Sequence, residues 1–338
     1  MTIVDVVLEE ERDEVKRFLK RFCLRYENDI DQTIVLKEKD QIIATASASN
    51  NIIKCIAIEP DYQGQNLLSL LMSEMIKRLS KAGIDHYFVY TMDEQVPLFK
   101  ALGLKPIVQT MTLSLLEGGS DITISLKELK SEYELSEKEK ACIVVNANPL
   151  TKGHEYLIET VATKHDDVIV FVVSEDRSVF PFDVRFEIVK KACARFNNVR
   201  VLPTLEYLVS YATFPKYFLK EEVNIAEEHA LIDVLIFKTY YMKVLNIKHR
   251  YVGEEPLSPM TQMYNKTMKK YLKDTLYIIP RKEFKCRPIS ASIVRGLLRK
   301  NGIDAVKPYL PQATLDFLCT QEGRDCIEKL KQRAHQRH

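Results

Sequence analysis

Apolar and polar positions along the first third of the chain follow two rhythms, which predict helices and strands. Helical spacing predicts an amphipathic helix over residues 9–23 and another over 67–79, each with one buried face. Short apolar runs between turn residues predict the remaining elements, which are a short helix at 96–102 and strands at 33–37, 42–46, 52–58, 87–91 and 107–113. Residues 1–116 are therefore predicted to form one α+β domain.

The pattern changes in the rest of the chain. Residues 117–140 are charged and hold few large apolar side chains outside 122–126, so we interpret them as a linker. From residue 141 to 338, strands and helices alternate in the manner of an α/β domain with a parallel sheet. Strands are predicted at 143–145, 168–173, 198–202, 275–279 and from Arg250, and helices after Gly153, up to Phe196, at 232–245 and 258–272, and beyond Pro311.

The first predicted strand of this second domain breaks into a polar turn, Asn146-Ala147-Asn148-Pro149, and then into a helix. Gly153 and His154 lie at the start of that helix. Free backbone N–H groups and the positive end of the helix dipole make such a place attractive to phosphate, and Gly153 would let a ligand approach the backbone closely. A single histidine at a helix start is more often a capping or packing residue, so this stretch alone leaves both interpretations open.

Two motifs together resemble the nucleotidylyltransferase superfamily, whose members cut ATP between its α and β phosphates. Thr151, Gly153 and His154 match its T-x-G-H motif, and residues 289–295, Ile-Ser-Ala-Ser-Ile-Val-Arg, match its I-S-(S/T)-(S/T)-x-x-R motif in the expected order. The resemblance implies catalytic roles for Thr151, His154 and Arg295. It also implies ATP binding by Asn146, Ala147, Asn148, Gly153, Ser290 and Ser292.

Gly253 and Glu254 follow the predicted strand that begins at Arg250. In open α/β sheets ligands lie beyond the carboxyl ends of strands, so we expect both residues to border the nucleotide. Mg²⁺ would arrive with ATP, and no metal site of the chain is predicted. Two further residues are weaker candidates for contact with acetate or phosphate. Arg177 stands where pantetheine-phosphate adenylyltransferases carry a basic residue, although a solvated charge explains it equally well, and Tyr211 lies in the loop 207–220.

The N-terminal domain resembles a GNAT N-acetyltransferase domain, whose loop N–H groups hold the pyrophosphate of coenzyme A and whose splayed strand pairs with pantetheine. The resemblance makes Ile56, Ile58, Gln63, Gly64 and Asn66 candidate contacts for a CoA-like group. The family pattern (Q/R)-x-x-G-x-(G/A) starts at Gln63, so Asn66 and Leu68 replace small residues. Phe99 stands where the family often has a tyrosine that acts as general acid. Acetyl transfer to an amine is therefore not expected. The alternative is that Gly64 only ends a turn in a structural domain that binds no CoA-like group.

Composition narrows the class of partner and the compartment. The chain has 49 Lys+Arg against 47 Asp+Glu, which gives no electrostatic reason to expect nucleic acid. Its 7 cysteines lack C-x-x-C spacing, so neither disulfides nor a zinc site is predicted. The first residues lack a signal-peptide pattern, and no apolar run approaches the roughly 18 residues of a membrane span, so we expect a cytoplasmic protein without membrane contact.

Over nearly its full length the chain resembles the citrate (pro-3S)-lyase ligase family, because the GNAT-like and T-x-G-H domains occur together with the 207–220 loop. The resemblance implies that ATP adenylates acetate and that the acetyl group then passes to the thiol of the CoA-like prosthetic group on the citrate lyase acyl carrier protein. Two alternatives remain. One is an adenylyltransferase of the pantetheine-phosphate or nicotinamide-mononucleotide type; the other is a GNAT acetyltransferase or CoA-binding regulator, which both intact ATP motifs disfavour.

Overall fold

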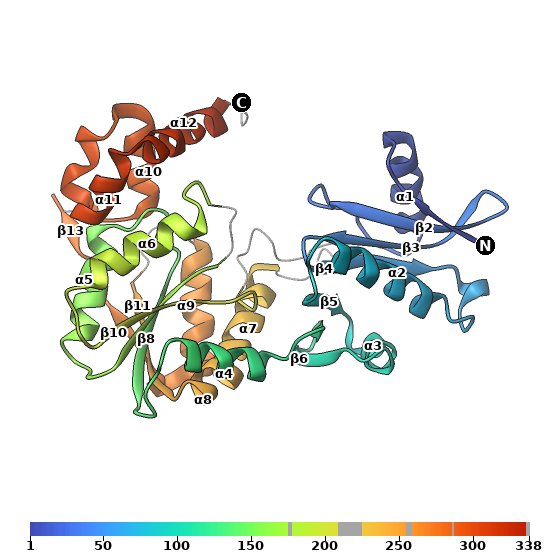
Figure 1. Cartoon of the computed structure of the whole chain (residues 1–338), viewed down its shortest axis with the longest axis horizontal. Helices are drawn as coiled ribbons and strands as arrows, with labels where there is room; N and C mark the ends of the chain where they lie inside the picture. Colours follow the sequence, from blue (N-terminus) through green and yellow to red (C-terminus); the bar gives the residue numbers. More distant parts are fainter. Residues whose placement is uncertain (175–177, 209–224, 255–258, 286, 336–338) are drawn as a thin grey trace. The chain divides into compact units, whose positions relative to one another are not determined.

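The computed structural model describes residues 1–174, 178–208, 225–254, 259–285 and 287–335. They form two compact units (Figure 1). Unit 1 comprises residues 1–125 and the described part of 212–232, and unit 2 comprises the described residues of 126–211 and 233–338.

Unit 1 is built on a seven-stranded sheet in the order β1-β2-β3-β4-β5-β7-β6. Only β4 and β5 pair in parallel; the other neighbours are antiparallel. The strands are β1 (Thr2–Asp5), β2 (Gln32–Glu38), β3 (Gln41–Ser49), β4 (Ile52–Ile58), β5 (Tyr87–Thr91), β6 (Lys105–Gln109) and β7 (Ser114–Gly118), and the helices are α1 (Glu9–Arg21), α2 (Leu67–Lys81) and α3 (Val96–Ala101). These bounds agree with most of the predicted elements.

The helices of unit 1 cover both faces of its sheet (Figure 1). On one face Phe18 and Leu19 of α1 pack against Val35 of β2, and on the other Leu71 and Met75 of α2 enter a larger core. Parallel pairing of β4 and β5 is recorded only near Ile52 and Ile53, so the later residues of the two strands are not paired with each other. The sheet therefore opens on the side where α2 begins.

The prediction of one closing strand at 107–113 is wrong, because the chain turns back within it. β6 ends at Gln109 and β7 begins at Ser114. Thr110 holds the turn: its Oγ1 accepts from the backbone N–H groups of Thr112 and Leu113, at 3.1 Å each. Local side-chain hydrogen bonds of this kind offer the backbone an alternative to the ladder, and here they end the strand.

Unit 2 contains a five-stranded, all-parallel sheet in the order β10-β9-β8-β11-β12. Its strands are β8 (Lys140–Val145), β9 (Val168–Val172), β10 (Val199–Pro203), β11 (Ile247–Gly253) and β12 (Leu276–Ile279). Its helices are α5 (Lys152–Ala162), α6 (Phe182–Cys193), α8 (Met242–Val244), α9 (Pro259–Leu272), α10 (Ala291–Asn301), α11 (Gln312–Leu318) and α12 (Gln321–His335), while α4 (Ile122–Glu132) and α7 (Ile225–Ile236) begin in unit 1.

β8 lies at the centre of this sheet. The chain adds β9 and β10 on one side of it, and later β11 and β12 on the other. The strand order therefore reverses next to β8, and a crevice forms at the carboxyl end of a strand where this happens. Asn146, which follows β8, stands at that point.

Helices cover both faces of the parallel sheet, which confirms the predicted α/β class (Figure 1). Leu157 and Ile158 of α5 pack with Ile143 and Val145 of β8 in the main core of unit 2. On the opposite face, the ring of Tyr241 lies 5.7 Å from that of Phe171 in β9. The apolar run predicted as one helix at 232–245 is helical but uneven, since α7 gives way to a π-helical turn at Phe237–Tyr241 before α8.

Residues 117–140 hold more regular structure than a simple linker. They comprise the end of β7, the whole of α4 and the first residue of β8, Lys140.

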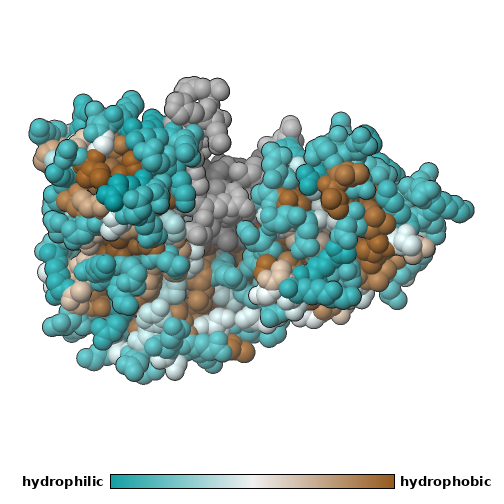
Figure 2. Space-filling model, turned by 45° about the horizontal axis from the view of Figure 1, so that its top comes forward, coloured by the Kyte–Doolittle hydropathy of each residue, from teal (hydrophilic) through white to brown (hydrophobic). Residues whose placement is uncertain are grey.

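The surface carries hydrophobic patches among mainly hydrophilic residues (Figure 2). In the described parts of the chain, no helix combines the length and hydrophobicity that a membrane crossing requires.

Candidate active site

A cavity of about 470 Å³ opens in unit 2 at the carboxyl edge of the parallel sheet. The loop after β8, the first turns of α5 and α10, and residues of β11 and α9 line it. It brings together most of the residues singled out in the sequence, namely Asn146, Ala147, Asn148, Thr151, Gly153, His154, Gly253, Ser290, Ser292 and Arg295.

Thr151 and His154 fix the start of α5 through a reciprocal cap. The Thr151 hydroxyl accepts from the backbone N–H of His154 at 3.4 Å, and the backbone N–H of Thr151 donates to Nδ1 of His154 at 3.0 Å. Because Nδ1 accepts a hydrogen bond, the neutral imidazole carries its proton on Nε2. The histidine therefore caps the helix with one nitrogen and keeps a donor on the other.

His154 is neutral at physiological pH. Burial among protein atoms, and then the charge of Arg281, lower the pKa of its imidazole to about 4. A neutral Nε2–H can donate to a phosphate oxygen without giving up its proton. His154 is therefore a capping residue, one of the two interpretations left open by the sequence. The cap uses Nδ1 and not Nε2–H, the group that a nucleotide would meet.

Gly153 allows two segments far apart in the sequence to meet. A Cβ on this residue would lie 3.1 Å from the carbonyl oxygen of Ile289 and 3.4 Å from Oγ1 of Thr151. Sequence reasoning expected a ligand at this backbone; the structure has the protein's own second motif there. Gly153 thus brings the start of α5 beside the start of α10.

The second motif builds another helix start in the same cavity. Ser290 caps α10, since its hydroxyl accepts from the backbone N–H of Ile293 at 3.3 Å. Arg295, one turn further on, is partly buried and donates to the carbonyl oxygen of Asn148 at 2.5 Å. Burial lowers the pKa of this guanidinium, yet it remains a cation at any physiological pH.

The charge of the cavity has one sign. Its described lining includes the cations Arg250, Arg281, Lys282 and Arg295, and no carboxylate. Two helix N-termini add further positive potential. The cavity is therefore suited to a polyanion such as a triphosphate.

Arg281 is a site residue that sequence reasoning did not identify. It follows β12, and its guanidinium donates to the carbonyl oxygens of Glu254 at 2.5 Å and of Ile289 at 3.4 Å. It therefore ties the end of β11 to the second motif. The available signal was a basic residue just past the carboxyl end of a predicted strand, the same rule that singled out Gly253.

Arg185 of α6 was missed as well. It is fully buried and donates to the carbonyl oxygens of Phe180 and Val173, at 2.9 and 2.7 Å. One of its NH groups also donates to the carbonyl oxygen and to Oδ1 of Asn146, at 2.9 and 3.1 Å. This cation supports the loop after β8 from beneath.

One predicted residue, Glu254, does not line this cavity, and two others lie outside the described residues. Glu254 contributes its backbone carbonyl to Arg281, but its side chain is exposed and does not line the cavity. Arg177 and Tyr211 lie outside the described residues.

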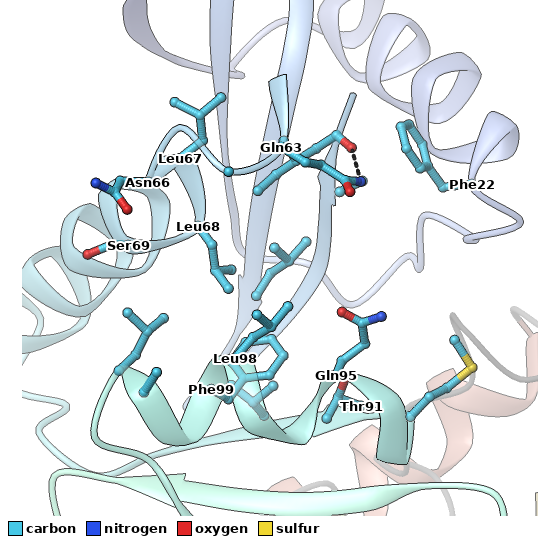
Figure 3. Close-up of a pocket in the computed structure, with 18 of the residues that line it drawn as sticks. Phe22, Gln63, Asn66, Leu67, Leu68, Ser69, Thr91, Gln95, Leu98 and Phe99 are labelled. Carbon is cyan, nitrogen blue, oxygen red and sulfur yellow. Dashed lines mark hydrogen bonds between the residues drawn. The ribbon is translucent and has the colours of Figure 1, made fainter. Parts of the chain in front are cut away.

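Unit 1 contains a different cavity, of about 600 Å³, between the diverging strands β4 and β5 (Figure 3). All five residues predicted to meet a CoA-like group line it: Ile56, Ile58, Gln63, Gly64 and Asn66. Figure 3 shows Leu68 of α2 opposite Leu98 and Phe99 of α3. Gly64 and Asn66 both have positive φ, 79° and 60°, so the loop is a tight left-handed turn.

The described lining of this second cavity contains no charged side chain. Phe99 is buried and has no proton to donate, as predicted. A long ligand could bind there through backbone groups and apolar contacts. The described lining carries no carboxylate or imidazole that could act as a general base toward an amine.

Magnesium fits neither cavity as a protein-held ion. Hard cations prefer carboxylate and carbonyl oxygen, and no group of three or more potential metal-ligating side chains occurs among the described residues. The described residues therefore offer Mg²⁺ no site made of protein ligands alone.

Two family profiles match the chain. The profile "Citrate lyase ligase C-terminal domain" matches residues 140–318, and "Acetyltransferase (GNAT) domain" matches residues 6–112. Together they confirm the predicted order of a GNAT-like domain followed by a nucleotidylyltransferase-like domain.

Curated relatives match over most of the chain. A citrate (pro-3S)-lyase ligase of Klebsiella pneumoniae is 34% identical over 316 residues, which cover 91% of this chain and 92% of the relative. One of Escherichia coli (strain K12) is 34% identical over 314 residues, 90% and 89% of the two chains. A phosphopantetheine adenylyltransferase of Clostridium perfringens (strain SM101 / Type A) is 41% identical, but over only 56 residues, 16% of this chain and 34% of the relative.

Proposed function

Because the chain belongs to the citrate (pro-3S)-lyase ligase family and is an enzyme, we propose that it activates citrate lyase by acetylating it at the expense of ATP. In this proposal the enzyme first makes acetyl-AMP and pyrophosphate from acetate and ATP. It then passes the acetyl group to the thiol of the CoA-like prosthetic group on the acyl carrier protein of citrate lyase, and AMP leaves.

In the first step a carboxylate oxygen of acetate attacks the α-phosphorus of ATP. A new oxygen–phosphorus bond forms as the bond to the β-phosphate's bridging oxygen breaks, so no proton needs to move. Negative charge grows on the oxygens of the α-phosphate and on the departing pyrophosphate. Catalysis of this kind depends on positioning and on fixed positive groups.

The single observation that carries the proposal is the one-sided charge of the unit 2 cavity, whose described lining has four cations and no carboxylate beside two capped helix starts. Within it, Nε2–H of His154 would donate to an α-phosphate or bridging oxygen. Thr151 would bond the nucleophile or phosphate. Arg295 would hold the β and γ phosphates with help from Arg281, and Arg185 would support the loop that carries Asn146.

In the second step the thiolate attacks the acetyl carbonyl, a carbon–sulfur bond forms, and the bond to the AMP oxygen breaks. We assign the N-terminal domain, residues 1–116, to holding the pantetheine-like arm that carries this thiol. Its cavity has a volume of about 600 Å³, is uncharged in its described lining, and is bordered by Gln63, Gly64 and Asn66 of the loop before α2. Holding thiol and acyl-adenylate within one protein replaces a bimolecular encounter by a local one.

Isotope exchange between pyrophosphate and ATP tests the proposal. We expect exchange only when acetate is present, and transfer of labelled acetyl to the thiol form of the carrier protein with one AMP released per acetyl. An adenylyltransferase of the phosphopantetheine type would instead need a phosphorylated acceptor and not acetate. It would join AMP to the phosphate of that acceptor and would exchange pyrophosphate when this adenylylated product is supplied. Exchange that ignores acetate would overturn the proposal.

A further inference from the structure

Two chemically different groups of residues line the unit 2 cavity. The first group belongs to the capped starts of α5 and α10 and includes His154 and Arg295. The second group belongs to β11 and α9 and includes the apolar residues Val252 and Met268. In the proposed function the triphosphate binds to the first group, which leaves the second for another part of the reaction.

Arg250 is the cation of the second group that β11 itself carries. It stands on β11 with Val252, two residues on, on the same face of the sheet, because side chains alternate along a strand. The intervening residue, Tyr251, belongs to the core on the opposite face with α5. Arg250 is only 5% exposed, yet it is among the residues that line the cavity.

The partners of Arg250 are unusually weak for a buried charge. Its guanidinium lies 4.6 Å from the ring centre of Phe237, and one NH group lies 3.8 Å from Sγ of Cys142. Its Nε is buried without a hydrogen-bond partner among the described residues. Buried charges are normally paired, and an arginine left with a ring and a thiol retains donors for a ligand.

The groups near this cation include a thiol and a carboxylate that already has a hydrogen-bond donor. Burial raises the pKa of the Cys142 thiol, so the sulfur beside Arg250 is uncharged. The carboxylate of Asp233 accepts a hydrogen bond from the hydroxyl of Tyr264, another residue of the cavity. Within the described residues, no ion pair joins Arg250 to a carboxylate.

We propose that Arg250 binds the carboxylate of the acid that is activated, and that the apolar residues beside it hold that acid's alkyl group. The proposal deepens the proposed function and rests on it. A planar guanidinium matches a carboxylate in geometry and charge, and it is not consumed when the acid reacts. The ligand class is a short monocarboxylate.

Met268 sets the length of the acid in this proposal. Its side chain is 2% exposed and lines the cavity, as does Val252. In the proposal both side chains contact the alkyl group of the acid, so a longer acid would have to displace them. Discrimination by size in an apolar pocket is modest, about 10- to 200-fold for one methylene.

The first test replaces Arg250→Gln and measures the KM values of acetate-dependent ATP–pyrophosphate exchange. We expect the KM for acetate to rise about 10- to 100-fold while the KM for ATP changes less than about twofold. The KM of Arg250→Lys for acetate should lie between those of the unaltered enzyme and Arg250→Gln, because lysine keeps the charge and loses the planar geometry. Lys248→Gln is the matched control, since it removes a cation from an exposed position of the same strand.

The second test does not depend on a buried charge and keeps the proposal open to refutation if Arg250→Gln fails to fold. Met268→Ala enlarges the apolar wall, so the ratio of kcat/KM for propionate to that for acetate should rise about tenfold or more. An unchanged ratio in this variant would contradict the proposal.

The outcomes separate the two levels of inference. If the unaltered enzyme shows no acetate-dependent exchange, the proposed function fails. If the unaltered enzyme shows this exchange but folded Arg250→Gln keeps its KM for acetate, only the assignment of Arg250 is wrong. The same holds if the variant loses affinity for ATP instead, because the cation then serves the nucleotide.

Discussion

The unit 1 and unit 2 cavities described above differ in charge rather than in size. The unit 1 cavity, of about 600 Å³, has no charged side chain in its described lining, while the unit 2 cavity, of about 470 Å³, has Arg250, Arg281, Lys282 and Arg295. A reaction that builds up negative charge needs fixed cations, and one that only guides a neutral arm does not. The contrast supports our proposal that covalent activation belongs to unit 2 and that unit 1 holds the arm.

The largest effect is expected at His154. His154→Ala should lower kcat for ATP–pyrophosphate exchange by roughly 10²–10³, because a preorganised donor to developing charge is lost, with little change in the KM for ATP. His154→Gln is the matched variant, since it can accept from Thr151 N–H and keep the cap. A folded His154→Ala variant that keeps the kcat of the unaltered enzyme and only unfolds more easily would assign the residue to capping alone.

Arg295 should affect ATP and not the acid. We expect Arg295→Gln to raise the KM for ATP about 10- to 100-fold, because charged hydrogen bonds to the β and γ phosphates are lost. The KM for acetate should stay nearly unchanged, the reverse of the pattern expected for Arg250→Gln. Titration of both substrates in steady-state exchange distinguishes the two arginines, and unchanged ATP kinetics would exclude Arg295 from the nucleotide site.

A charge placed in the unit 1 cavity should damage only the second step. Leu68→Glu puts a carboxylate beside the proposed pantetheine-like arm, so acetyl transfer to the carrier protein should fall about tenfold while exchange is retained. Leu70→Glu on the same helix is the control, because Leu70 is 44% exposed and does not line the cavity. Transfer at the full rate in Leu68→Glu would remove unit 1 from the reaction.

The smallest effect concerns pH. The pKa of His154 is lowered from 6.5 to about 4, so the unfolded chain binds a proton that the native state refuses as pH falls from 6.5 toward 4. Stability should therefore decrease over this window and be fully present above it. Chemical unfolding at several pH values measures the slope, which His154→Gln should flatten. The same slope in both proteins would contradict the lowered pKa.

Local signals explain why the central site could be predicted. Residues close together in the sequence form the loop after β8, the Thr151 cap and the Ser290 cap. Their chemistry depends on helix starts, and cap residues in the sequence predict where those helices start. Their meeting in one cavity followed from the parallel order of the strands. The splayed strands of unit 1 were expected from the resemblance of residues 1–116 to a GNAT domain, and β4 and β5 do diverge after Ile53.

Features that depend on tertiary contacts could not be predicted. Arg185 supports Asn146 only because α6 is folded against the sheet, and a lone arginine in a helix looks like a solvated charge. The strand predicted at 107–113 failed since Thr110, rather than glycine or proline, makes the turn. The π-helical turn at Phe237–Tyr241 leaves no mark in an apolar run.

The hydroxyls of Thr110 and Thr112 both donate to the carboxylate of Glu228 in α7, at 3.0 Å each. Thr110 and Glu228 are 118 residues apart in the sequence, although both belong to unit 1. During synthesis from the N-terminus, unit 1 can therefore collapse early but cannot make these hydrogen bonds until α7 has left the ribosome. Contacts between residues this far apart in the sequence form later and more slowly than local ones.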